Sequence, residues 1–544
     1  MKTYNLLLLI FPFILHGQTQ KSVDQLRLIS IDPLKSVFKY YEADLRDEEY
    51  TSHVARGETA TFQVVLQTPF DLNNVSVNTV LFKTLNNDGL PAKLRTVRYV
   101  NVPRSIKEPP SDVLKPKDRM FPDVLSEIPN ENVGKWENQS YFISVEVPFD
   151  AKPGVYIGKI ILNARSNGRK VALEKELKIK VYKAQLPKDQ ALNVTTWWNN
   201  ARSIFKGFPG KADLIAEIAS FQSKYKHNGA IVNVLYLTDF EENDGKYTFD
   251  FSAVDSIVEK FQQNGNFRFF ESAFLTKASQ GWGTPFKFIL PVKENGKRTY
   301  PLVALDDTRA HNFYKQFFRQ FVDHLKQKGL VKAFYQHVGD EPMHRNIDSY
   351  NTALALVKKW APELKLIDAV QSAAVSPKLD ITVPILDNFH KELDRYDTKA
   401  RTSKNKEMWL YTCWAPQGEY ANRLIELPLI KTRYLFWICA KYDMTGFLHW
   451  GFNNWNSNPV RQAPINAGDA WIAYPENGKI IPSARLEAMR DGINDYELLV
   501  CLKRKNPALA KEIENTIIYG ANSYNKDIKS FRAARIRLLE ALSN

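Results

Sequence analysis

Between residues 193 and 450 the sequence alternates short apolar segments with segments of helical periodicity, which constrains the fold more than any other feature. Helical periods include Ala212–Lys226, Ala310–Lys328, Ser349–Trp360 and Leu427–Ala440. The eight expected strands are Asn193–Trp197, Gly229–Leu235, Phe267–Ala273, Ala333–Gly339, Lys365–Val370, Ile381–Leu386, Glu407–Tyr411 and Gly446–Trp450. Eight such units in about 250 residues predict a (β/α)₈ barrel of the TIM type. A doubly wound open sheet is the alternative, although no glycine-rich turn follows Trp197 to suggest a dinucleotide site.

The part of the chain before this region shows short alternating strands separated by proline and glycine turns. The clearest strand segments are Thr59–Leu66, Tyr141–Val147, Val155–Leu162 and Glu174–Tyr182. This spacing predicts a β-sandwich. Because 544 residues are too many for one core, we expect several domains. The expected domains are a β-sandwich at 18–187, a catalytic barrel at 188–505 and a C-terminal helical segment at 506–544.

The first residues have the pattern of a secretory signal peptide. Lys2 supplies a positive charge, Leu6–Leu15 is almost entirely apolar, and His16-Gly17-Gln18 interrupts the run. We therefore expect residues 1–17 to be a signal peptide and the mature chain to be periplasmic or secreted in a bacterium. No later stretch is apolar for long enough to span a bilayer, so stable membrane insertion is not expected.

The charge and cysteine content exclude several classes of function. The formal net charge is +14, but lysines and arginines are spread along the chain and mixed with acids, and no nucleic-acid motif is present. No nucleic-acid partner is therefore expected. Three scattered cysteines do not make a disulfide framework, and no Cys/His spacing is typical of a zinc site. No metal or other cofactor is expected, and the sequence does not indicate an oligomeric state.

Two adjacent carboxylates, Asp340 and Glu341, end the predicted fourth strand, and Pro342 follows them at once. Adjacent carboxylates repel each other, and a buried pair is uncommon without a function. In a barrel the C-terminal ends of the strands form the mouth that carries the active site. A solvated turn that happens to contain Asp-Glu-Pro is the alternative interpretation of the three residues alone.

Neighbouring carboxylates favour one type of glycoside hydrolysis. Most glycosidases place two carboxylates on opposite sides of the scissile bond, about 5–9.5 Å apart. Adjacent residues on a strand point in divergent directions and seldom flank one bond. They suit a substrate-assisted route, in which the carbonyl oxygen of a 2-acetamido sugar attacks the anomeric carbon. Glu341 would then be the general acid and base, and Asp340 would orient the acetamido N–H.

Aromatic and polar side chains at the predicted strand ends suggest a sugar site. Ten of the eleven tryptophans lie between Trp197 and Trp471, although core packing is an equal alternative for each one. His337 could tune the carboxylate pair or could be an ordinary core residue. Asn453, Asn454, Asn199 and Asn200 are candidates for reading the 4-hydroxyl of the sugar. The candidate substrate-binding residues are Tyr411, Trp450, Trp414, Trp198, His337 and Asn453.

These motifs resemble two known families. His337-Val-Gly339-Asp340-Glu341 is similar to the His-x-Gly-Gly-Asp-Glu signature of β-N-acetylhexosaminidases, with one glycine missing. The chain resembles glycoside hydrolase family 123 more closely. That family has Asp-Glu in this position, a β-sandwich before a (β/α)₈ barrel, and a late segment like RLEAMRDGINDYE at Arg485–Glu497. Lys226-His227-Asn228 and Trp450-Gly451 also look like that family.

The resemblance to family 123 implies an exo-acting, retaining β-N-acetylgalactosaminidase that acts on glycans or glycolipids. It implies Asp340 as the acetamido-orienting residue and Glu341 as the acid and base. It further implies a tyrosine that contacts the acetamido oxygen, placed at Tyr411 by its position, and Trp450 as the floor of the sugar subsite. Two alternatives remain: a β-glycosidase for another sugar such as β-GlcNAc, and a non-catalytic glycan-binding protein on a barrel scaffold.

Overall fold

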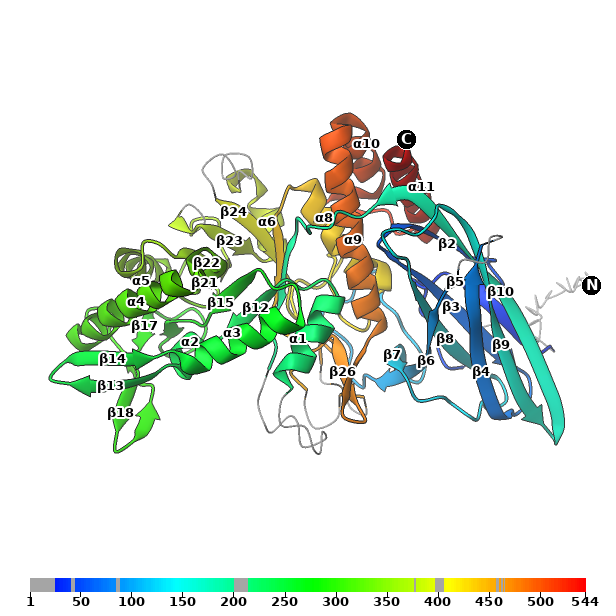
Figure 1. Ribbon diagram of the computed structural model, residues 1–544, viewed down its shortest axis with the longest axis horizontal. Helices are drawn as coiled ribbons and strands as arrows, with labels where there is room; N and C mark the ends of the chain where they lie inside the picture. The colour runs from blue at the N-terminus through cyan, green and yellow to red at the C-terminus, as the bar shows by residue number, and fades with distance from the viewer. Residues whose placement is uncertain are drawn as a thin grey trace, which may run out of the picture.

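The computed structural model describes residues 25–40, 45–84, 89–199, 214–375, 378–396, 406–455, 459–460, 463 and 465–544. The predicted signal peptide and Asn200 lie outside these residues. A β-sandwich and a barrel occupy opposite ends of the molecule, and the C-terminal helices lie between them (Figure 1).

The N-terminal part is formed by two five-stranded sheets that pack face to face. The first sheet has the order β1 (Arg27–Ile31), β3 (Thr59–Thr68), β8 (Glu137–Glu146), β6 (Ala92–Asn101), β7 (Met120–Ser126). The second has the order β2 (Thr51–Arg56), β10 (Arg169–Gln185), β9 (Gly154–Ser166), β4 (Asn73–Lys83), β5 (Gly89–Leu90). Alternate residues of β9, such as Ile160 and Leu162, are buried against Phe62 and Ile143 of the facing sheet. The sandwich predicted from the alternating segments is therefore present.

The second part is a closed barrel of eight parallel strands. Its strands, in order around the barrel, are β11 (Asn193–Thr196), β12 (Gly229–Val232), β15 (Phe269–Ser272), β21 (Phe334–Gln336), β22 (Lys365–Val370), β23 (Ile381–Pro384), β24 (Glu407–Tyr411) and β25 (Gly446–His449). All eight correspond to predicted strands, and the pairing of β11 with β25 closes the sheet. This closure confirms the barrel and excludes the open doubly wound sheet.

Helices cover the outside of the barrel. They are α1 (Ile215–Lys224), α2 (Val234–Leu237), α3 (Ser252–Asn264), α4 (Thr308–Lys328), α5 (Ile347–Trp360), α6 (Leu386–Lys391), α8 (Leu429–Lys441) and α9 (Ala484–Lys505), with short 3₁₀ turns η2 (Val331–Ala333) and η4 (Leu393–Arg395). The longest crossover helix, α4, shows how the sequence sets their ends. The Asp307 carboxylate caps its first turn, Gly329 ends it in the left-handed conformation, and Phe313, Phe317 and Phe321 form its buried face.

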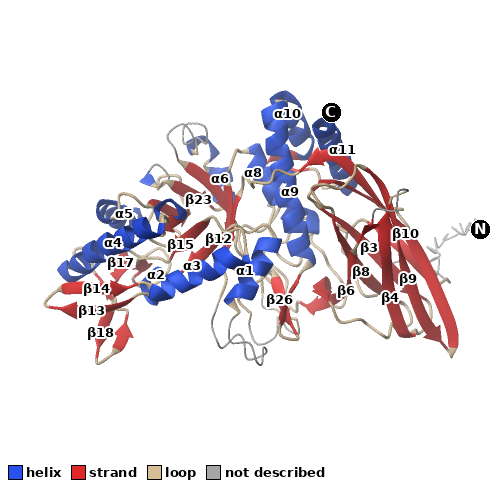
Figure 2. Cartoon of the chain, viewed as in Figure 1, coloured by secondary structure: helices blue, strands red, loops and turns tan. Residues whose placement is uncertain are grey.

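Several small sheets lie in the loops and were not predicted (Figure 2). They are β13 (Asp239–Asn243) with β14 (Lys246–Asp250), β16 (Thr276–Ala278) with β17 (Phe286–Ile289) and β20 (Leu302–Val303), β18 (Val292–Glu294) with β19 (Lys297–Thr299), β26 (Ala473–Glu476) with β27 (Lys479–Pro482), and β28 (Ile518–Gly520) with β29 (Ser523–Tyr524). The β16–β17–β20 sheet belongs to the loop that follows the third barrel strand. It is important because it packs against the loop that carries Asp340.

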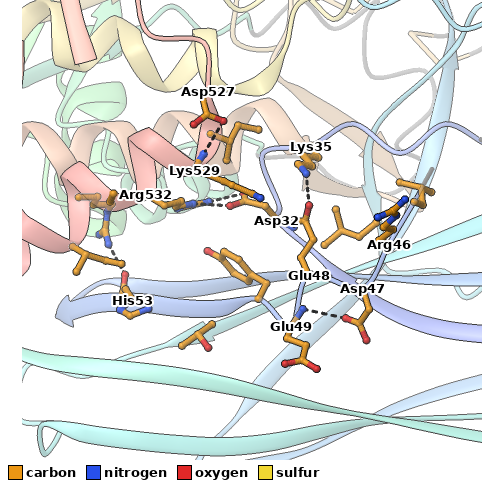
Figure 3. Close-up of a pocket in the computed structure, with 18 of the residues that line it drawn as sticks. Asp32, Lys35, Arg46, Asp47, Glu48, Glu49, His53, Asp527, Lys529 and Arg532 are labelled. Atoms are coloured by element: carbon orange, nitrogen blue, oxygen red, sulfur yellow. Dashed lines mark hydrogen bonds and ion pairs between the residues drawn. The ribbon is translucent and has the colours of Figure 1, made fainter. Parts of the chain in front are cut away.

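The C-terminal helices α9, α10 (Pro507–Ile517) and α11 (Ile528–Ser543) join the two parts. Asp495 of α9 accepts hydrogen bonds from Arg433 of α8 and from Arg535 of α11, and Arg535 also pairs with Glu58 of the sandwich. Asp32 of the sandwich is directed toward Arg532 of α11 (Figure 3), and each of its carboxylate oxygens accepts a hydrogen bond of 2.8 Å from a guanidinium nitrogen.

Further contacts hold α9 in place. Arg490 pairs with Asp491 and Glu487, so the late segment is a structural brace. The cap of α9 is Ser483, whose hydroxyl accepts from the Leu486 amide. Among the described residues no helix is long and apolar enough to cross a bilayer.

A buried ion pair between α9 and the sandwich generates a stability prediction. Arg485 of α9 donates to both carboxylate oxygens of Asp123 in β7 at 2.9–3.1 Å, and both side chains are buried. Replacing Asp123 with alanine leaves the Arg485 charge without its anion, so we expect a loss of about 3–5 kcal/mol in the free energy of unfolding. Chemical denaturation of the two proteins measures it.

The matched control is Glu174→Ala, which removes an exposed pair between Glu174 and Lys159 on the sandwich surface. We expect a change below about 1 kcal/mol for that variant. Equal losses for the two variants would contradict a structural role for the buried bridge.

Candidate active site

Two of the larger cavities lined by the described residues differ in position, which distinguishes their roles. The larger, about 910 Å³, lies between the sandwich and α11 (Figure 3). The charged groups in its wall pair with one another, as in Asp32 with Arg532 and Lys35 with Glu48. The second, about 680 Å³, lies at the C-terminal mouth of the barrel and is lined in part by Asp340. Because barrel enzymes bind their substrates at this mouth, the second cavity is the candidate active site.

Asp340 and Glu341 lie in the loop after β21, four residues beyond its last residue, Gln336. The strand is therefore shorter than predicted, and the pair is carried by a loop. Glu341 has a φ of 47°, in the left-handed region that non-glycine residues seldom adopt. Such backbone strain persists only where the surroundings hold it, and it is concentrated at functional sites.

The residue before the pair must be small. A Cβ atom on Gly339 would lie 2.7 Å from the Thr276 hydroxyl and 2.9 Å from the Phe286 ring. The Thr276 side chain donates to the carbonyl of Val338 at 2.7 Å. The sheet formed by β16, β17 and β20 therefore presses directly on the loop and leaves room only for glycine at position 339.

Beneath the loop, the buried carboxylate of Asp368 in β22 holds the backbone in place. It accepts hydrogen bonds from the amides of Val338 and Gly339 at 3.0 and 3.2 Å. It also accepts from the Tyr350 hydroxyl at 2.6 Å and from the His337 ring at 2.9 Å. These four hydrogen bonds attach the loop to the barrel core, so the core determines the conformation of the loop.

His337 lies between two carboxylates and is fully buried. Its Nδ1 is 2.9 Å from Asp368 and its Nε2 is 2.9 Å from Glu271 of β15. Burial alone would disfavour a charged ring, but these two carboxylates raise the pKa of His337 to about 9. The ring is therefore an imidazolium at neutral pH. Glu271 also accepts from the indole of Trp197 at 3.1 Å, which ties the aromatic wall to the same cluster.

The two loop carboxyls are both harder to ionise than free side chains. Desolvation in the barrel mouth raises the pKa of Glu341 to about 7, and repulsion from Asp340 adds to it. Desolvation raises the pKa of Asp340 to about 6, with a contribution from Asp368. Asp340 is exposed and lines the cavity, whereas Glu341 is half-buried.

Aromatic side chains form one wall of the cavity. Trp198, Tyr236, Phe274, Trp282 and Trp450 line it, and the Trp282 ring is 56% exposed. The Trp450 indole donates to Asp469 at 2.8 Å, which fixes the ring plane. Flat apolar faces with fixed orientation suit the C–H faces of a sugar ring.

The other predicted site residues lie around this cavity or away from it. Tyr411 is buried beside the pair, and its hydroxyl donates to Glu341. Asn453 is fully buried and braces a loop by bonding to the amide and carbonyl of Asn199 at 2.8 and 3.1 Å. Trp414 is 52% exposed but does not line this cavity, whereas Asn199 and Asn454 do.

Four residues around the pair were missed by sequence reasoning: Glu271, Asp368, Gln371 and Asp469. A signal existed for two of them, because Glu271 and Asp368 are single acids inside short apolar strands, where a charge is rarely buried without a partner. Gln371 and Asp469 lie in loops without a recognisable motif. Within the described residues, no group of three or more His, Cys, Asp or Glu side chains could hold a metal ion.

Comparisons with known proteins agree on one family. The sequence profile of the glycoside hydrolase 123 catalytic domain matches residues 215–502, and that of the glycoside hydrolase 123 N-terminal domain matches residues 38–164. A solved family 123 glycoside hydrolase from Clostridium perfringens, described in connection with glycolipid glycan hydrolysis, has a TM-score of 0.72 at 17% identity. The match covers 95% of this chain and 97% of that one.

More distant structural matches are much weaker. A β-D-glucuronidase from Dictyoglomus thermophilum has a TM-score of 0.32 at 8% identity, covering 80% of this chain and 66% of its own. A termite-gut xylanase of family 10 with an Ig-like domain has a TM-score of 0.32 at 11% identity, covering 82% and 99%. Scores this low do not show a shared fold, and no curated protein matches the sequence.

The catalytic profile alone spans more than half of the chain and contains the loop with Asp340 and Glu341. It also contains the late segment and all the barrel strands except β11. The chain belongs to glycoside hydrolase family 123.

Proposed function

We propose that the protein removes terminal β-linked N-acetylgalactosamine from glycans or glycolipids, with retention of configuration and with assistance from the 2-acetamido group. The observation that carries this proposal is the adjacent pair Asp340 and Glu341 at the cavity, with the pKa of Glu341 above that of Asp340. When their environments separate the pKa values of two neighbouring carboxyls, one of them can act as the acid while the other stays ionised.

In the first step, protonated Glu341 gives its proton to the glycosidic oxygen. The acetamido carbonyl oxygen attacks the anomeric carbon, the bond to the leaving group breaks, and a cyclic oxazolinium forms. Ionised Asp340 accepts the acetamido N–H and offsets the developing positive charge. In the second step, Glu341 removes a proton from water, which attacks the anomeric carbon and reopens the ring. Two inversions at one carbon give net retention.

The neighbouring carboxylates support this route over direct attack by the protein. Glu271 and Asp368 lie beneath the loop, fully buried and bonded to His337, so neither can approach a sugar carbon. Asp469 is bound by the Trp450 indole. The nucleophile is then best supplied by the substrate itself.

The shape of the site supports a terminal sugar as the substrate. A cavity of about 680 Å³ is typical of a small-molecule pocket and is small for a long stretch of polymer. Family membership and the glycolipid substrate named for the Clostridium perfringens enzyme favour glycolipids or glycoproteins as sources of that sugar. Export to the periplasm or the cell exterior, expected from residues 1–17, would give access to them.

A substrate panel tests the proposed function. We expect hydrolysis of nitrophenyl N-acetyl-β-galactosaminide, weaker hydrolysis of N-acetyl-β-glucosaminide, and none of plain β-galactoside, which lacks the acetamide. Release of nitrophenol under identical conditions is the measurement. Comparable rates on β-galactoside would rule out assistance, and binding of the sugars without any product would favour the glycan-binding alternative.

Loss of the acid is the second expectation. Glu341→Gln preserves the shape of the side chain but cannot transfer a proton, so kcat should fall by about 10²–10⁴-fold. Glu363→Gln is the control, because Glu363 is an exposed carboxylate that pairs with Lys326. Near-normal kcat in Glu341→Gln, with a fold like that of the control, would remove Glu341 from the acid role.

The pKa values set the pH dependence. Asp340 must be ionised, so the rate rises as the pH passes about 6, and Glu341 must be protonated, so the rate falls as the pH passes about 7. We expect a narrow bell-shaped profile of kcat/KM with its maximum between these values. In Asp340→Asn the acidic limb should vanish while the alkaline limb remains; retention of both limbs would contradict the assignment.

A further inference from the structure

A chain of hydrogen bonds runs from Asn388 through Gln371 and Tyr411 to Glu341. A backbone carbonyl beside Asn388 determines which group donates in each of these bonds. The side-chain amide of Asn388, on α6, contacts the carbonyl oxygen of Gln371 at 2.7 Å and the side-chain oxygen of Gln371 at 2.7 Å. A backbone carbonyl can only accept a hydrogen bond. The group of Asn388 that faces it must therefore be the NH₂, which donates to both oxygens.

The orientation of Asn388 in turn fixes the orientation of the Gln371 side-chain amide. Because the Asn388 NH₂ fixes the side-chain oxygen of Gln371, the NH₂ of Gln371 points the other way, to the Tyr411 hydroxyl at 2.9 Å. That NH₂ can only donate, so the tyrosine oxygen accepts. The single proton of Tyr411 is then directed at its other neighbour, the carboxyl of Glu341.

The backbone of Gln371 restrains the same loop from a second point. Its amide donates to the carbonyl of Pro342, the residue after Glu341, at 3.0 Å. Tyr411 is buried, and Gln371 and Asn388 are half-buried. These contacts leave few alternative partners for the three side chains, because a buried polar group that changes orientation loses its hydrogen bonds.

We propose that Asn388 and Gln371 are positioning residues that make Tyr411 an obligatory hydrogen-bond donor, so that its hydroxyl holds the carboxyl of Glu341 in place. The catalytic meaning of this inference rests on the proposed function, in which Glu341 transfers the proton. The orientation of the chain stands on the contacts alone. With its oxygen occupied by Gln371, Tyr411 can give its proton only to Glu341 or to a substrate oxygen that replaces it.

This arrangement affects the ionisation of Glu341. Desolvation and the negative charges of Asp340 and Asp469 favour the protonated form of Glu341, whereas hydrogen bonds from the Tyr411 hydroxyl and from the Gln371 side chain favour its anion. The hydrogen-bond chain therefore limits the rise in the pKa of Glu341. Without this limit Glu341 would be protonated at neutral pH and would be a poor base in the second step.

The titration of Glu341 in the free protein tests the proposal without a substrate. Its carboxyl band is isolated in infrared spectra at a series of pH values by subtracting the spectra of Glu341→Gln. We expect a midpoint near pH 7 in the unaltered protein. Asn388→Leu, Gln371→Met and Tyr411→Phe should each raise it by about one pH unit, because the donor to the anion is lost or released.

A double-mutant cycle separates positioning from general disturbance. If Asn388 acts through Tyr411, then Asn388→Leu should cause no further shift in a Tyr411→Phe background. Lys391→Met is the control on the same helix, because Lys391 is exposed and pairs with Asp387; it should not move the midpoint. Asn388→Ala serves the same cycle if Asn388→Leu does not fold, because the Gln371 side chain also donates directly to Glu341 and Gln371→Met would remove that bond.

The outcomes distinguish this inference from the proposed function. An unchanged midpoint in Asn388→Leu or Gln371→Met, or equal shifts with and without Tyr411, would overturn the positioning role. Shifts as expected, with Glu341→Gln still active on the glycosides, would uphold the directed chain and reject the acid role of Glu341.

Discussion

The carboxylate of Asp368 is the interaction on which the site depends. It accepts from two consecutive backbone amides, a tyrosine hydroxyl and a buried histidine, and so fixes the loop that carries Asp340 and Glu341. Glu341 can remain in the left-handed conformation because this anchor and the sheet pressed against Gly339 leave the loop no relaxed alternative. The strain at the acid is therefore supported by the barrel core.

The charged groups of the site form two layers, a buried cluster around His337 and the pair Asp340 and Glu341 above it. The imidazolium of His337 balances Glu271 and Asp368 in the core, where unpaired carboxylates would be costly. Asp340 and Glu341 lie above it, without a basic side chain among the main influences on Glu341. Desolvation raises both pKa values toward neutrality, with a contribution from Asp368 at Asp340 and from Asp340 at Glu341. Carboxyls with pKa values near neutrality are typical of catalytic sites.

Much of the fold could be predicted because it is encoded locally. Apolar segments and helical periods predicted all eight barrel strands, and the Asp-Glu-Pro element predicted a site at the mouth of the barrel, where a cavity lies beside Asp340. What could not be predicted depends on tertiary contacts. Asn453 has the side chain of a sugar-binding residue, yet it braces a loop. His337 needed two acids from other strands to become a cation, and the chain through Asn388 joins residues that no spacing relates.

In the proposed mechanism the acetamide of the sugar is the nucleophile and Asp340 holds it. The most direct measurement is the inhibition constant of N-acetylgalactosamine-thiazoline, which mimics the cyclised intermediate, for the unaltered protein and for Asp340→Asn. The account predicts tight competitive inhibition that weakens about tenfold or more when the carboxylate is lost, which corresponds to at least about 1.4 kcal/mol. Failure to inhibit, or equal inhibition of both proteins, would contradict it.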